Sequence, residues 1–227
     1  MRWSPNWTST DGTGLMELPM FPLEWVLLPG EELALRIFER RYTVLIGDLM
    51  RSGDPRFGVV LIARGREVGG GEQRNVVGTM TSITNCAELG AGRYALRCLT
   101  GERIRVDGWL VDDPYPRADV ELWPDEPGEP VSDSRFRELE DRIVALHKQM
   151  AVAQRRWLAP GRNAMLGGRK MRSLEPTQRL YSLACRVPMG EADRYAVLAA
   201  PSLNERLTAL HEAIETVSAR VEFESPR

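Results

Sequence analysis

The sequence predicts an α+β protein in which a β-rich first part is followed by an α-helical second part. Short apolar runs separated by proline and glycine fill residues 15–124, whereas residues 132–227 carry apolar side chains at intervals of three and four. Between them, residues 125–131 combine prolines, a glycine and acids. We therefore expect a flexible tail over residues 1–14, a β-rich domain over 15–124, a linker over 125–131 and a helical bundle over 132–227.

The first part opens with a predicted strand, turn, strand unit over residues 18–38. Pro19, Pro22 and Pro29 exclude a helix from its first half, and the Pro29-Gly30 step is typical of a turn. Residues 39–50 then predict a short amphipathic helix with an apolar face formed by Tyr42, Leu45, Ile46 and Leu49.

Four more strands are expected in the first part. A β-branched run at residues 57–63 predicts a strand buried on both faces, and glycines at 65–71 predict a loop. Further strands are expected at 76–88, 93–111 and 118–123. In the second of these, alternation predicts that Arg103 and Arg105 face outward while Ile104 and Val106 face inward.

The second part predicts helices that bury one apolar face each. A long helix carries Phe136, Leu139, Ile143, Leu146, Met150, Ala153 and Trp157. After a connector at residues 158–175, shorter helices are expected to begin at Pro176 and Glu191. Ser202 and Glu205 match a capping box that starts a last helix, with apolar residues Leu203, Leu207, Leu210, Ile214, Val217 and Val221.

Composition limits the possible function classes. The chain is 43% apolar and 27% charged with a net charge of −2, which is typical of a soluble globular protein. No apolar run reaches the length of a membrane span, and the polar start lacks a signal sequence, so we expect a cytoplasmic protein without membrane contact. Three cysteines without Cys-x-x-Cys spacing, and two isolated histidines, predict reduced thiols and neither a metal site nor a cofactor.

Several segments, in order, resemble the Lon substrate-binding domain, the amino-terminal (peptidase S16-like) recognition domain of Lon proteases, which also occurs as a stand-alone protein. The segments are the opening unit, Phe-Gly-Val-Val-Leu-Ile at residues 57–62, Val-Gly-Thr at 77–79, the hairpin at 92–106 and Pro-Tyr-Pro-Arg at 114–117. With the helices, the likeness covers residues 16–220. It implies a PUA-like, partly closed β-barrel followed by helices, and a role in protein quality control by holding unfolded protein.

Catalytic parts of a complete Lon protease are missing from this sequence. The glycine-rich stretch at residues 67–73 lacks the lysine and hydroxyl of a phosphate-binding loop. The two lysines, Lys148 and Lys170, fall outside any motif of a serine–lysine protease. We therefore expect a binding module and not an enzyme.

Candidate binding residues fall in two groups. In the first part, Trp25 could anchor an apolar peptide or be half-buried, and Phe38, Glu39 and Tyr42 gather where a strand meets a helix, with an ion pair capping the helix as the alternative. In the connector, adaptable apolar and basic side chains suit a partner surface or a merely solvated loop: Met165, Leu166, Arg169, Lys170, Met171 and Arg172.

Three functions follow as hypotheses. The first is a non-catalytic module that binds unfolded protein or peptide segments through apolar anchors and an exposed sheet edge. The second is an adaptor that docks on a separate ATP-dependent protease through the basic connector. The third is RNA binding, because PUA-like folds also occur in RNA-binding proteins; the negative net charge and the lack of aromatic residues among the arginines argue against it.

Overall fold

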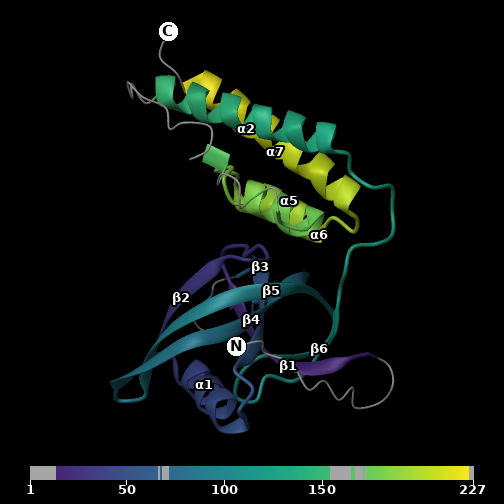
Figure 1. Ribbon diagram of the computed structural model, residues 1–227. Coiled ribbons are helices and arrows are strands. Elements are labelled where there is room, and N and C mark those ends of the chain that lie inside the picture. Colours follow the sequence, from purple (N-terminus) through teal and green to yellow (C-terminus); the bar gives the residue numbers. More distant parts are fainter. Residues whose placement is uncertain are drawn as a thin grey trace. The chain divides into compact units, whose positions relative to one another are not determined.

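The computed structural model describes residues 14–65, 67, 72–153, 165–166, 171 and 173–224 (Figure 1). The chain divides into two compact units. Unit 1 consists of Met1–Leu27 and Glu32–Pro124, and unit 2 consists of Leu28–Glu31 and Asp125–Arg227. Among the described residues, none of the helices is both long enough and apolar enough to cross a membrane.

The described residues of unit 1 form six strands and one helix. The elements are β1 (Met16–Leu23), β2 (Glu32–Ile37), α1 (Arg40–Ser52), β3 (Arg56–Arg64), β4 (Gln73–Gly90), β5 (Arg93–Trp109) and β6 (Arg117–Leu122). Each strand and the helix predicted from the sequence are present, with bounds shifted by a few residues. Helix α1 ends at Gly53, whose φ of 75° lies in the left-handed region that glycine enters without strain.

The six strands form one sheet that partly closes on itself. Their order is β2-β5-β4-β3-β1-β6, and an additional pairing between β5 and β6 joins the sheet into a ring of five strands. Strand β2 lies outside this ring, where it pairs with β5 (Figure 1). The predicted α+β fold with a partly closed β-barrel is thereby confirmed.

Strand β1 divides its pairing between two neighbours. Residues 16–19 pair antiparallel with β6, and residues 20–23 pair in parallel with β3. Each half therefore has a ladder partner on one side. This division explains how Pro19 and Pro22, which lack an N–H group, are tolerated within a strand of the ring.

Two apolar clusters form the interior of unit 1. One cluster takes residues from α1, β1, β2, β3 and β5, including Phe21, Leu35, Leu45 and Phe57. The other takes residues from all five ring strands: Leu18, Met20, Val60, Met80, Ile104, Val106, Ala118 and Val120. Because β3 contributes to both clusters, the prediction that both of its faces are buried is confirmed.

One predicted orientation in β5 is wrong. Arg103 was expected to face solvent, but its side chain is buried at 4% exposure. Its guanidinium lies 4.3 Å from the ring centre of Trp123, so the indole that follows β6 covers it. Arg105 is exposed as expected and pairs with Glu121.

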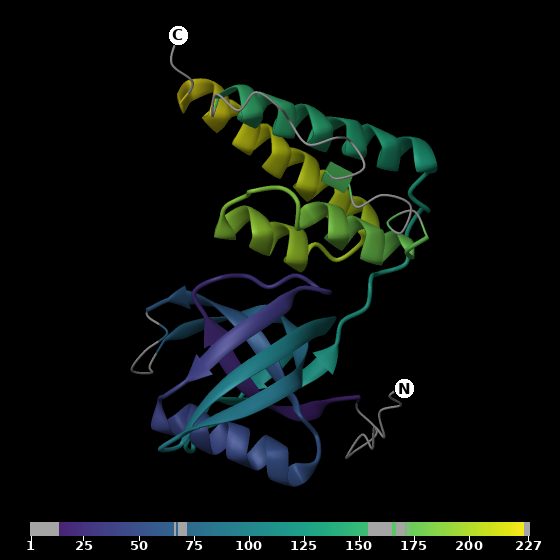
Figure 2. The ribbon, with the colours of Figure 1, turned by 60° about the vertical axis from the view of Figure 1, so that its left-hand side comes forward.

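Unit 2 contains the helices α2 (Asp133–Ala153), α5 (Pro176–Ala184), α6 (Glu191–Ala199) and α7 (Leu203–Glu224). Helices α2 and α7 lie side by side and run in the same direction (Figure 2). Three side-chain hydrogen bonds follow this parallel arrangement along the two helices: Arg135 with Asn204, Arg142 with Glu215, and Gln149 with Glu222. Most residues of the predicted seams are buried, but those nearest the helix ends, Met150, Ala153, Leu203 and Val221, are half-buried. Helix α2 ends at Ala153, and Trp157 lies outside the described residues.

The start of α7 confirms the predicted capping box. The N–H of Ser202 donates to Glu205 Oε2 at 3.2 Å, and the N–H of Glu205 donates to Ser202 Oγ at 3.3 Å. Near it, Arg206 is fully buried and donates to both carboxylate oxygens of Asp125. Asp125 falls in the segment that composition assigns to a linker, yet it is held firmly within unit 2.

Candidate functional site

The free side of β2 is the first component of the candidate site. Strand β2 pairs with β5 from Glu32, opposite Leu99, to Ile37, opposite Tyr94. Among the described residues, no other strand pairs with it, and no backbone hydrogen bond outside that ladder involves residues 32–37. Alternate backbone groups of β2 therefore remain available to an added strand.

The outer face of β2 is polar at its ends and small in the middle. Glu32, Ala34 and Arg36 are exposed, whereas Leu33, Leu35 and Ile37 point into the core. This alternation is the expected pattern for a strand with one buried face. An extended segment placed beside β2 would therefore meet backbone groups at its edge and these three side chains on its outer face.

Two exposed aromatic side chains flank β2 along the chain. Trp25, two residues after β1, is 40% exposed, and Phe38, directly after β2, is 65% exposed. Both side chains could contact an apolar client from solvent, as the sequence predicted for them. Their role in binding remains a prediction.

The loop between β3 and β4 joins the segments that carry these aromatic residues. Glu24 Oε1 accepts a hydrogen bond from the N–H of Glu67 at 3.2 Å, and Arg41 Nη2 donates to the carbonyl of Glu67 at 2.9 Å. Trp25 follows Glu24, and Phe38 precedes Arg41 by three residues. The single loop residue Glu67 therefore binds both segments, a contact that no pattern in the sequence predicts.

The carboxylates of Glu24, Glu39 and Glu67 lie close enough to affect each other electrostatically. Burial raises the pKa of the Glu67 carboxyl, and the nearby carboxylates of Glu24 and Glu39 raise it further. Glu39 pairs with Arg41 at 3.2 Å. The side chain of Glu39 makes no capping hydrogen bond to α1, so its contribution at the helix start is the ion pair.

Tyr42 lies in the core and not at the surface. Its side chain is 2% exposed and stacks on Phe21 with ring centres 4.1 Å apart, while the guanidinium of Arg41 covers the ring at 4.5 Å. Burial raises the pKa of its hydroxyl, and the buried oxygen has no hydrogen-bond partner among the residues that the structure describes. Tyr42 therefore belongs to the core of unit 1 and offers almost no surface to a partner.

The candidate residues of the connector divide into two sets. Met165, Leu166 and Met171 are buried, and Arg186 donates to the carbonyl of Met165 at 3.2 Å. Arg169, Lys170 and Arg172 lie outside the described residues. The prediction that this basic segment binds a partner therefore stays a prediction.

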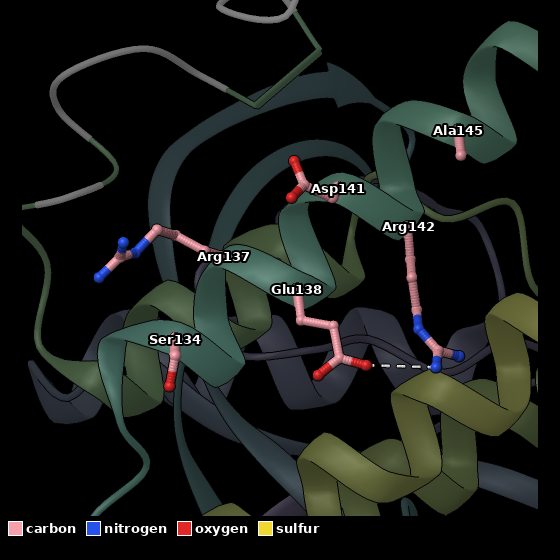
Figure 3. Close-up of a pocket in the computed structure, with 6 residues that line it drawn as sticks. All are labelled: Ser134, Arg137, Glu138, Asp141, Arg142 and Ala145. Carbon is pink, nitrogen blue, oxygen red and sulfur yellow. Dashed lines mark hydrogen bonds and ion pairs between the residues drawn. The ribbon is translucent and has the colours of Figure 1, made fainter.

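A shallow pocket in unit 2 lies along α2 and is lined by Ser134, Arg137, Glu138, Asp141, Arg142 and Ala145 (Figure 3). All six belong to one helix, and four of them are charged. Arg142 pairs with Glu138 at 3.2 Å and with Glu215 at 3.0 Å, so its charge is already balanced. The pocket is open to solvent along one helix face and lacks the enclosed, concave form of a small-molecule site.

The isolated histidines and cysteines form no metal centre in the part of the chain that the structure describes, where no group of three or more metal-binding side chains occurs. His147 Nε2 lies 3.0 Å from the carbonyl oxygen of Arg186. Cys98 is buried, and burial raises the pKa of its thiol to about 12, which keeps the thiol protonated and unreactive.

Comparison with known structures identifies similar folds. A Lon N-terminal domain protein from Xanthomonas campestris is 26% identical, with a TM-score of 0.59 over 87% of this chain and 98% of that chain. The N-terminal domain of the Mycobacterium avium complex Lon protease is 15% identical, with a TM-score of 0.54 over 88% of this chain and 98% of that chain, and shows a shared fold. A search of curated proteins found no match.

The family pattern described as the ATP-dependent protease La (LON) substrate-binding domain matches residues 17–216, which span both the sheet and the helices. This match confirms the resemblance drawn from the opening unit and the strands that follow it. The family is that of a substrate-recognition module. The chain therefore belongs to the family of the Lon substrate-binding domain.

Proposed function

We propose that this chain is a non-catalytic recognition module that binds unfolded protein or extended peptide segments along β2. The family match supports substrate recognition in general, and the free edge of β2 is the observation that supports this particular mode. A client strand would pair its backbone with β2, because an unfolded segment always carries unpaired N–H and C=O groups. Binding of this kind tolerates many sequences.

Trp25 and Phe38 would add apolar affinity to the backbone pairing. Both are exposed, and the Glu67 loop joins their segments. Truncating an aromatic anchor at a protein interface typically costs about 1–2 kcal/mol, which is about 5- to 30-fold in affinity. The two side chains together would thus account for much of a weak interaction.

A client-aggregation assay tests the proposal. The purified chain, in excess over a reduced, unfolding client protein, should suppress light scattering by the client. The double variant W25A/F38A should suppress it much less, whereas F223A should act as wild type, because Phe223 is an even more exposed aromatic residue and lies at the end of α7, away from β2 in the sequence. No suppression by the wild type, or equal suppression by all three proteins, would contradict the proposal.

A further inference from the structure

The edge of β2 lacks a bulge, a proline and a lysine, three of the features by which proteins usually protect an unpaired strand. Its register with β5 continues without a bulge from Glu32 to Ile37. It contains neither proline nor lysine, and it is six residues long. A regular, open edge of this kind is a template for another strand.

The two charged residues of this edge lie at equal distances on either side of Ala34. Glu32 and Arg36 each lie two residues from Ala34, on the same outer face, and they have opposite signs. Neither forms an ion pair with the residues that the structure describes. About 13 Å of strand separates them, so they cannot pair with each other.

We propose that β2 pairs antiparallel with β2 of a second copy, about a two-fold axis at Ala34. This register places Glu32 of each copy opposite Arg36 of the other, and Ala34 opposite itself. On the buried face, Leu33 lies opposite Leu35 of the second copy. The pairing therefore joins two sheets with two cross-strand ion pairs and no like charges opposed.

Charge complementarity selects this register over its neighbour. A two-fold axis perpendicular to the sheet keeps the buried faces of both copies on one side, which requires residues of the same face to pair. An axis at Leu35 also pairs five residues of each copy, but it places Arg36 opposite Ala34 and leaves Glu32 unpaired. Only the axis at Ala34 matches both charges.

Self-pairing would cover the backbone edge that the proposed function assigns to a client. Dimer formation and client binding would then exclude each other, and the free edge would be hidden when clients are scarce. The dimer itself does not rest on the proposed function. It is tested without any client, so the failure of one proposal leaves the other standing.

Charge reversal tests the register. In sedimentation equilibrium, the wild type should pass from monomer to dimer as its concentration rises from micromolar to millimolar. In E32R and R36E, two attractive pairs become two repulsive pairs, so the dimer dissociation constant should rise by about tenfold or more. Mixing the two variants should restore dimers, because each reversed charge then meets its opposite, and E32R/R36E should dimerise as wild type.

A cysteine at the axis provides an independent measurement. Directly opposite residues of antiparallel strands have Cα atoms about 4.5–5.5 Å apart, a separation that a disulfide can span. In oxidised glutathione, A34C should form a covalent dimer, and A87C, on the same face but in β4, should not. A wild type that stays monomeric throughout, single reversals that dimerise as wild type, or A34C that fails to crosslink would overturn the proposal.

Discussion

Replacing Asp125 by alanine is expected to destabilise unit 2 by about 2–3 kcal/mol. Arg206 is fully buried, and its guanidinium donates to Asp125 Oδ2 at 3.0 Å and Oδ1 at 2.5 Å. Thr177 also donates to this carboxylate at 2.7 Å. Removing one partner of a buried ion pair costs about 3–5 kcal/mol, because the other charge stays buried without compensation.

Two features place the expected loss below that range. The Asp125 side chain is itself 19% exposed, so solvent already screens part of the interaction. Arg206 Nη2 also keeps its hydrogen bond to the carbonyl of Ala200 at 3.2 Å. The double variant D125A/R206M removes the orphaned charge and should recover part of the lost stability.

Urea denaturation gives the change in the free energy of unfolding, and hydrogen exchange of peptides from α5 and α7 assigns it to unit 2. The second measurement is needed because the two units need not unfold as one transition. E126A is the matched control, since Glu126 is the exposed neighbour of Asp125. If D125A unfolds within about 0.5 kcal/mol of E126A, the buried pair does not stabilise the unit as argued.

Three further outcomes are expected. G78A should lose about 1–3 kcal/mol of stability by denaturation, because an added Cβ would lie 2.1 Å from the carbonyl oxygen of Val59 and force the strands apart; unchanged stability would show that β3 and β4 yield easily. Y42F should unfold at the same urea concentration as wild type or higher, because the buried Tyr42 hydroxyl has no hydrogen-bond partner within the described part of the chain; a clear loss of stability would reveal a bonded hydroxyl. Burial and nearby Arg142 lower the pKa of His211 in the folded chain, so protonation favours unfolding and stability should fall as pH drops below about 6.5; an H211Q variant with the same pH profile would exclude His211 as the cause.

The elements of the fold could be predicted because their signals are local. Proline positions and alternation identified the strands, and the intervals of three and four identified α2 and α7. The Ser202 capping box was equally local, since both of its hydrogen bonds join residues three apart.

Pairing and burial across long distances could not be predicted in the same way. Arg103 is buried because Trp123, 20 residues later, covers it, and alternation within β5 carries no information about that cover. Asp125 has the composition of a linker, yet its partner Arg206 is 81 residues away. The composition of a segment carries no information about which distant residue will contact it.

The candidate site was anticipated in part. Trp25 and Phe38 were named from the sequence and are exposed, and an open sheet edge was expected, but its assignment to β2 required the strand order. The hydrogen bonds of Glu24 and Arg41 with Glu67 join residues far apart in the chain, and no periodicity of the sequence predicts such contacts. The burial of Tyr42, in contrast, could be predicted, because Tyr42 lies on the apolar face that the sequence predicts for α1.

The divided pairing of β1 has a consequence for synthesis of the protein on the ribosome. Glu17 of β1 pairs with Arg117 of β6, 100 residues later in translation, so the first half of β1 waits about 5–20 seconds for its partner. During that interval the nascent chain exposes apolar side chains to neighbouring polypeptides. Pro19 and Pro22 withhold two backbone donors from foreign strands, and thereby lower the risk of premature aggregation.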